Sequence, residues 1–294
     1  MFYRRKIILA LLQTFNGELE KIPLQKLLFL FTIKQQKPEY DFIPYKYGCY
    51  SFSANADLFT MVKKEQLAET ESSYKCLEKT DYTSTLKDAD KRIVQQIKIL
   101  YGKYSKDQLI KHTYTNYPYW AINSTIANSV LTVTELQKVN QYKSTAENTT
   151  LFTIGYEGIS LEAYLNKLIK SGVQLLVDVR NNPLSMKYGF SKSQLKKYCE
   201  SVNIQYIHLP EVGIQSEQRQ ALNTQADYDK LFDVYKKESL TKTQSTQQQI
   251  LSLLIQHKRI ALTCFEANIC QCHRKHLAEA ITALPEFNYA LKHI

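Results

Sequence analysis

The chain has 294 residues, of which 44% are hydrophobic and 22% are charged, and this composition is typical of a globular protein with two ordinary domains. It has no run of about eighteen apolar residues, so we expect neither a transmembrane helix nor a membrane partner. Six cysteines are too few for a secreted disulfide framework of this length, so we expect reduced thiols and a cytoplasmic location.

The first half of the chain is predicted to be mostly helical. Apolar residues recur at helical spacing in KIILALLQTF (6–15) and in LQKLLFLFTI (24–33). The first of these segments fits an amphipathic helix better than a signal peptide, because no small-residue cleavage site follows it. Aromatic and polar residues alternate in YDFIPYKYGCYSFS (40–53), which indicates a short extended hairpin.

Helical patterns continue after the hairpin. We expect helices in ADLFTMVKKEQLAE (56–69) and in residues 87–103, and another that begins at Ser105, a favourable N-cap. Helices around a small hairpin are typical of a winged-helix-like module. Residues 1–147 are therefore expected to form a helical domain for recognition or partner binding.

The polar segment KSTAENTT (143–150) separates this half from an α/β pattern, so a second domain is expected over residues 148–294. Apolar strands alternate there with amphipathic helices, which predicts a mainly parallel sheet with helices on both faces. The expected strands are LFTIGYEG (151–158), VQLLVDVR (173–180), IQYIHLP (204–210) and RIALTCFE (259–266). The expected helices are 160–172, 191–203, 226–240, 247–258 and 272–284.

Reactive side chains stand at the ends of three of these strands. Tyr156 and Glu157 end one strand, Asp178 and Arg180 end the next, and the last strand runs into CFEANICQCHR (264–274). Because the carboxyl ends of parallel strands share one edge of the sheet, and ligands bind beyond that edge, we expect these groups to form one site.

The same four segments resemble the domain-of-unknown-function 488 family. The resemblance rests on TIGYEG, on DVRNNPLS followed by GFS, on IQYIHLP and on CFE followed by CHR, and it covers about residues 151–285. It implies an α/β fold and a site at these motifs, and it supplies no reaction. The chain departs from the family pattern at EVGI (211–214), where a pair of glycines is common, and at the additional Cys270.

A looser resemblance covers about residues 5–125. LQKLLFLF, YDFIPYKYGCYSFS, SKDQLIKHTY and YPYW are similar to SocA-like antitoxin (Panacea) domains of bacterial regulatory and toxin–antitoxin proteins. This resemblance implies a recognition or partner-binding role without a catalytic motif.

The expected site contains two acid/base carboxylates, Asp178 and Glu266. Arginine side chains in the site suit phosphate or another anion, and tyrosines can stack on a base. An ion pair between Asp178 and Arg180 that fixes the following loop is the simpler alternative. The expected substrate-binding residues are Tyr156, Glu157, Arg180, Ser185, Tyr188, Phe190, Ser191, Cys264, His273 and Arg274.

The cysteine-rich segment allows three interpretations. Its C-x5-C-x-C-H spacing lacks the paired C-x-x-C of structural zinc sites, although Cys264, Cys270, Cys272 and His273 could share a metal. A thiolate at the start of the last helix could be reactive. The third interpretation, in which the cysteines are packed scaffold, is the one we favour, so we expect no metal and no cofactor.

Both halves are basic, with 21 basic and 15 acidic residues in 1–150 and 17 and 13 in 151–294, and the chain has 21 tyrosines. These features favour contact with nucleic acid, DNA in particular. We expect a bacterial enzyme that acts on nucleic acid or nucleotide, as a hydrolase of an N-glycosidic or phosphate-linked substrate. The alternative is an antitoxin-like regulatory protein that binds DNA or a protein partner and senses a small anionic ligand through its α/β domain.

Overall fold

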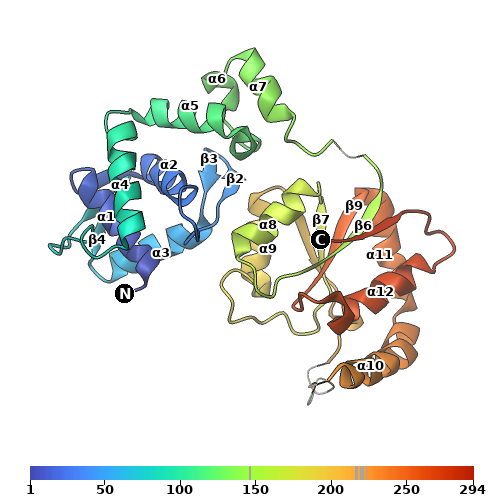
Figure 1. Ribbon diagram of the computed structural model, residues 1–294. Helices are drawn as coiled ribbons and strands as arrows, with labels where there is room; N and C mark the ends of the chain where they lie inside the picture. The colour runs from blue at the N-terminus through green and yellow to red at the C-terminus, as the bar shows by residue number, and fades with distance from the viewer. Residues whose placement is uncertain (146, 216–217, 219–221, 223) are drawn as a thin grey trace. The chain divides into compact units, whose positions relative to one another are not determined.

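The structure, a computed structural model, describes residues 1–145, 147–215, 218, 222 and 224–294. The chain divides into two compact units, Met1–Lys143 and Ser144–Ile294 (Figure 1). None of the helices in the described part of the chain has the length and apolar character needed to span a bilayer.

The N-terminal unit is built mainly from helices, as the sequence predicts. Its α-helices are α1 (Tyr3–Thr14), α2 (Lys21–Thr32), α3 (Phe52–Lys63), α4 (Asp88–Tyr101), α5 (Lys106–Asn116), α6 (Ala127–Val130) and α7 (Val133–Asn140), with a 3-10 turn η1 (Pro118–Ala121). The core lies between α1 and α2, where residues 7–12 and 27–31 are all buried. Ser105 caps α5 by accepting a hydrogen bond from the Gln108 amide, so the predicted helix start is confirmed.

Two small sheets complete this unit. The predicted hairpin is present as β2 (Ile43–Tyr45) and β3 (Gly48–Tyr50), which pair antiparallel. A three-stranded antiparallel sheet has the order β1 (Glu18–Glu20), β5 (Ser73–Cys76), β4 (Leu67–Glu69), and the sequence pattern did not predict it as a sheet. These strands are short, and one of their pairings joins distant segments, so alternation of apolar residues gives little signal. The winged-helix assignment stays a prediction.

The C-terminal unit contains an all-parallel sheet of five strands. The strand order is β10 (Ala290–His293), β6 (Thr150–Gly155), β9 (Arg259–Cys264), β7 (Leu175–Asp178) and β8 (Gln205–His208). The predicted α/β fold and parallel sheet are confirmed. The sequence did not predict β10, because its four residues are largely exposed and lie at the edge of the sheet.

Helices cover both faces of this sheet (Figure 1). They are α8 (Leu161–Lys170), α9 (Lys192–Ser201), α10 (Gln225–Val234), α11 (Gln244–His257) and α12 (His273–Thr282), with a π-helical turn η4 (Tyr235–Leu240) and 3-10 turns η2 (Pro210–Val212) and η5 (Ile269–Gln271). Residues of α11 and α12 form one core with the β7 side chains Leu175 and Val177. On the other face, the Tyr164 hydroxyl of α8 donates to Thr263 of β9.

Candidate functional site

Three strand ends meet at the carboxyl edge of the sheet, as the sequence predicts. Gly155 at the end of β6 is paired with Cys264 at the end of β9, and Asp178 at the end of β7 is paired with Thr263. Since β9 lies between β6 and β7, residues that follow these strands share one edge. This placement follows directly from the parallel order of the strands.

The predicted side chains point to opposite faces at this edge. Asp178 is in register with Thr263, which faces α8 through its hydrogen bond from Tyr164. Cys264 is the next residue along β9, so its side chain alternates to the other face, where it lies 3.6 Å from Nδ1 of His273 in α12. The edge therefore holds two groups of side chains, one around Asp178 and one around Cys264.

The Asp178 group is a closed hydrogen-bond network. Asp178 is fully buried, and Arg180 donates to both of its carboxylate oxygens, from Nε at 2.8 Å and from Nη2 at 2.5 Å. The Tyr206 hydroxyl donates to the same carboxylate at 2.6 Å. Burial alone lowers the pKa of Arg180, but the hydrogen bonds and charge of Asp178 outweigh it and raise the pKa above its ordinary value. The Asp178 carboxylate therefore accepts hydrogen bonds from both Arg180 and Tyr206 and holds the two side chains in place.

Two predicted aromatic residues form a wall behind this network. Tyr156 and Phe190 are buried and stacked, with ring centroids 4.2 Å apart and planes 9° from parallel. Nη1 of Arg180 donates to the Tyr156 hydroxyl at 2.7 Å and to the Phe190 carbonyl at 2.8 Å. The Tyr156 hydroxyl and the Phe190 backbone carbonyl therefore orient Arg180. Tyr188 is exposed instead, and its hydroxyl lies 2.6 Å from that of Tyr198.

Two predicted serines shape the loop after β7. The hydroxyl of Ser191 donates to the Ser185 carbonyl at 2.9 Å, and the Lys187 amide donates to the Ser185 hydroxyl at 3.2 Å. Ser191 is also the N-cap residue of α9, where its hydroxyl makes no capping hydrogen bond. Both serines therefore hold the loop onto the start of α9.

Glu157 and Gly155 hold the loop after β9 in place. The amides of Tyr156 and Glu157 donate to the Phe265 carbonyl at 3.1 and 2.9 Å, and the Ala267 amide donates to the Glu157 carboxylate at 2.9 Å. A Cβ at Gly155 would lie 2.0 Å from the Glu266 carbonyl oxygen, so only glycine permits this approach. Glu157 thus positions the loop that carries Glu266.

Arg274 fixes the same loop from α12. Its guanidinium donates to the Glu266 carbonyl at 2.5 Å and to the Ala267 carbonyl at 3.3 Å. The side chain is 3% exposed, and its Nε atom is buried without a hydrogen-bond partner. This arrangement makes Arg274 a positioning residue for the backbone beside Glu266.

The Cys264 group contains two thiols and an imidazole. One ligand atom each from Cys264, Cys272 and His273 lies within 4.8 Å of the other two, and all three residues are buried. The Cys264 thiol donates to Oε2 of Glu266 at 3.1 Å. Burial, supported by the neighbouring Cys264, raises the pKa of the Cys272 thiol well above its ordinary value. Cys270 is exposed and lies outside this group.

A pocket of about 330 Å³ opens at this edge of the sheet. Four predicted site residues line it, namely Tyr156, Arg180, Ser185 and Cys264. The described residues that line this pocket do not include Asp178 or Glu266. The sequence argument missed Asn181, Asn182, Leu184, Met186, Ile214 and Phe265, which also line the pocket. The signal for the asparagines was available, since they follow directly after the DVR strand end.

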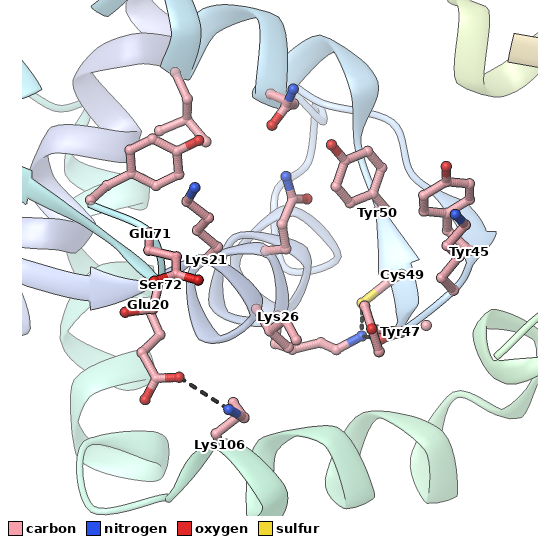
Figure 2. A pocket seen from close by; sticks show the side chains of 17 residues that line it. Glu20, Lys21, Lys26, Tyr45, Tyr47, Cys49, Tyr50, Glu71, Ser72 and Lys106 are labelled. Atoms are coloured by element: carbon pink, nitrogen blue, oxygen red, sulfur yellow. Dashed lines mark hydrogen bonds and ion pairs between the residues drawn. The ribbon is translucent and has the colours of Figure 1, made fainter. Parts of the chain in front are cut away.

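The N-terminal unit has a pocket of its own, of about 420 Å³, between α2 and the β2–β3 hairpin (Figure 2). Lys26 lies in its wall, is 1% exposed, and donates to the Tyr47 carbonyl and to the Cys49 sulfur at 3.5 Å. Burial lowers the pKa of Lys26, and the nearby Cys49 offsets this only in part. A single lysine among the apolar residues of LQKLLFLF was the signal that sequence reasoning passed over.

Residues 160–281 match the family model of the domain of unknown function DUF488, from the start of α8 almost to the end of α12. The C-terminal unit contains a DUF488 domain. The match includes the Asp178–Arg180 network and the Cys264 group, and it confirms the family resemblance seen in the motifs. No curated protein matches the chain significantly. The SocA-like resemblance of residues 5–125 stays a prediction.

Proposed function

We propose that the DUF488 domain of this chain is a hydrolase that acts on a nucleotide or on a base of nucleic acid, with N-glycosidic bond cleavage as the reaction. One observation carries the proposal: a pocket at the carboxyl edge of a parallel sheet combines an oriented arginine, polar amides and an exposed aromatic ring. In folds of this kind, that edge is where ligands bind.

The pocket residues suit the parts of a nucleotide. Phe265 is 42% exposed and offers a ring face for stacking on a base. Asn181 and Asn182 carry amide groups that can donate to and accept from a base edge. Arg180 lines the pocket, its orientation is fixed by Asp178 and Tyr156, and its positive charge attracts a phosphate.

Glu266 is the proposed acid/base group. It follows the β9 strand end, its carboxylate accepts from the Cys264 thiol at 3.1 Å, and Cys264 lines the pocket. Asp178 is assigned the role of positioning Arg180, because both of its oxygens already accept hydrogen bonds. Cleavage of an N-glycosidic bond requires a group that activates water or protonates the departing base, and one carboxylate can do this.

The proposal is tested with the full chain and a panel of nucleosides, nucleotides and single-stranded DNA, by chromatography of released bases. Glu266→Gln should keep ligand binding and lose turnover by at least about a hundredfold, because an amide cannot accept the proton. Glu200→Gln changes an exposed glutamate that pairs with Lys196 on α9 and should remain active. A fully active Glu266→Gln variant, or no released base from any substrate, contradicts the proposal.

A second candidate function is supported by the separate pocket and the basic charge of the N-terminal unit. In this alternative the N-terminal unit binds DNA or a protein partner, and the DUF488 domain senses a small anionic ligand through Arg180. Binding of duplex DNA should then weaken steeply as salt rises. Anisotropy titrations at two salt concentrations, with and without added nucleotide, test this alternative. Absence of binding at low salt contradicts a role with DNA.

A further inference from the structure

We propose that Cys264, Cys272 and His273 bind a transition-metal ion, and that zinc is the ion that this ligand set favours. Two thiolates and one imidazole are ligand types that zinc takes in proteins. The Cys264 and Cys272 sulfurs and one His273 nitrogen lie within 4.8 Å of one another in the folded chain. The site itself does not depend on the proposed hydrolase activity.

The spacing of two ligand atoms already fits a bound ion. Tetrahedral zinc, with Zn–S near 2.3 Å and Zn–N near 2.0–2.1 Å, places a sulfur and a nitrogen about 3.6 Å apart. The Cys264 sulfur and Nδ1 of His273 are 3.6 Å apart. No side chain has to move for these two atoms to share one ion.

His273 is oriented as a metal ligand usually is. Its Nε2 lies 3.0 Å from the Val179 carbonyl oxygen, which can only accept a hydrogen bond, so Nε2 carries the proton. The lone pair is therefore on Nδ1, the atom that faces the Cys264 sulfur. Tyr235 packs edge-on against the ring, with centroids 5.5 Å apart. Ligating histidines commonly donate their other ring nitrogen to such a carbonyl, which fixes both tautomer and ring orientation.

The backbone brings the three ligands together from two rigid elements. Cys264 is the last residue of β9, Cys272 is the N-cap of α12, and His273 is the first residue of that helix. The intervening chain turns through η5, which leaves Cys270 exposed and outside the group. This turn explains why the spacing in the sequence does not resemble a paired-cysteine zinc motif.

Charge balance assigns a role to Glu266 beside the ion. A divalent ion with two thiolates and a neutral imidazole carries no net charge, which suits ligands that are 0–1% exposed. Glu266 is half-buried beside the three ligands, with its Oε2 3.1 Å from the Cys264 sulfur. The fourth position would be open to water. If the proposed function holds, an ion held here would activate a bound water, and Glu266 would be the group that accepts its proton.

The test is the metal content of the full chain, purified under reducing conditions, incubated with zinc and desalted, by mass spectrometry. We expect about one zinc per chain. Cys264→Ser, Cys272→Ser and His273→Ala should each lower bound zinc by at least about tenfold. Cys270→Ser and Cys199→Ser are matched controls that change cysteines outside the group and should retain zinc.

Cobalt provides a second measurement that does not depend on the fold of a variant. Cobalt(II) added to the wild-type chain should give the thiolate charge-transfer band and the visible bands of a tetrahedral site, and zinc should abolish them. A wild-type chain that binds neither ion, a disulfide between Cys264 and Cys272, or zinc loss in Cys270→Ser equal to that in Cys272→Ser overturns the proposal. A chain that binds zinc and releases no base retains this site and contradicts only the hydrolase.

Discussion

Each of the two units buries a basic side chain at a pocket, and the groups that surround the two side chains differ. Arg180 in the C-terminal unit is 5% exposed, and Lys26 in the N-terminal unit is 1% exposed. Asp178 offers Arg180 a full negative charge through two hydrogen bonds. Lys26 instead donates to the Tyr47 carbonyl and the Cys49 sulfur, and no carboxylate among the described residues accepts from it.

The difference teaches how a buried cation is retained. Burial penalises the charged form of both side chains. For Arg180, the hydrogen bonds and charge of Asp178 outweigh the effect of burial, and the pKa is raised. For Lys26, Cys49 does not outweigh the effect of burial, and the pKa is lowered. The guanidinium is therefore a permanently charged and oriented part of the C-terminal pocket. The amine of Lys26 is more readily neutral, which is the form that can act as a nucleophile.

Removing the charge partner of Arg180 should have the largest effect. Asp178→Asn leaves a buried guanidinium uncompensated, so the free energy of unfolding of the C-terminal unit should fall by about 3–5 kcal/mol. Urea unfolding followed by far-UV circular dichroism measures it. Trp120, the single tryptophan, packs against the N-terminal core, so its fluorescence transition should stay unchanged. Asp233→Asn, at an exposed pair with Lys236, is the control.

Removing one hydrogen bond from the same carboxylate should cost less. Tyr206→Phe deletes the hydroxyl that donates to Asp178 at 2.6 Å, and a hydrogen bond to a charged group contributes about 1.5–3 kcal/mol. The same circular dichroism transition reports the loss. Tyr198→Phe deletes an exposed hydroxyl paired with Tyr188 and should change the transition little. Equal losses in both variants would show that the carboxylate contributes nothing specific.

Lys26→Met should be tolerated, in contrast to Asp178→Asn. Methionine has an unbranched chain of similar length, and volume-conserving changes in a core usually cost less than about 1.5 kcal/mol. Because Lys26 has no carboxylate partner, no opposite charge is left buried. Trp120 fluorescence in urea reports this unit. A loss above about 3 kcal/mol would mean that a charged Lys26 stabilises the fold, and the contrast with Arg180 would fail.

A pH series gives the smallest and most specific effect. The pKa of Lys26 in the folded state lies below 10.5, its ordinary value, which we take for the unfolded chain. At a pH between the folded-state and unfolded-state pKa values, the unfolded chain binds more protons than the folded chain. The free energy of unfolding therefore rises with pH in this range. The slope is at most about 1.4 kcal/mol per pH unit. We compare the protein that keeps Lys26 with Lys26→Met, both in a Cys49→Ala background. The protein with Lys26 should gain stability relative to the variant as the pH rises from the lowered folded-state pKa toward 10.5. The Cys49→Ala change removes a thiol whose raised pKa would make the free energy of unfolding fall as the pH rises, which would oppose the effect of Lys26.

Parallel curves for the two proteins would contradict a lowered pKa at Lys26. Tyrosines with raised pKa values near this side chain, such as Tyr114, contribute to both curves and cancel in the comparison.

The parallel sheet and its edge could be predicted from the sequence because each depends on local patterns. Buried apolar strands alternate with amphipathic helices, and parallel order alone brings Gly155, Asp178 and Cys264 to one edge. The face that each side chain takes could not be predicted. It depends on strand register, since Asp178 aligns with Thr263 and Cys264 is one residue further on.

The sequence also could not predict which side chains and strands are brought together by loops and tertiary contacts. The spacing could not separate Cys270 from Cys264 and Cys272, because the separation comes from the η5 turn. The ion pair of Asp178 with Arg180 was one of two alternatives that the sequence left open, and the structure contains it. In the N-terminal unit, the pairing of β1 with β5 joins segments more than fifty residues apart, which local periodicity does not register.

We expect the edge strand β10 to limit self-association of the chain. It covers one side of β6, whose residues Thr150–Gly155 are almost wholly buried and carry no charge. If Ala290–His293 were deleted, β6 would present a row of unpaired amide and carbonyl groups on an uncharged strand. Such edges template strand addition between molecules and lead to aggregation. Truncated forms made to study the DUF488 domain alone should therefore retain these four residues to remain monodisperse.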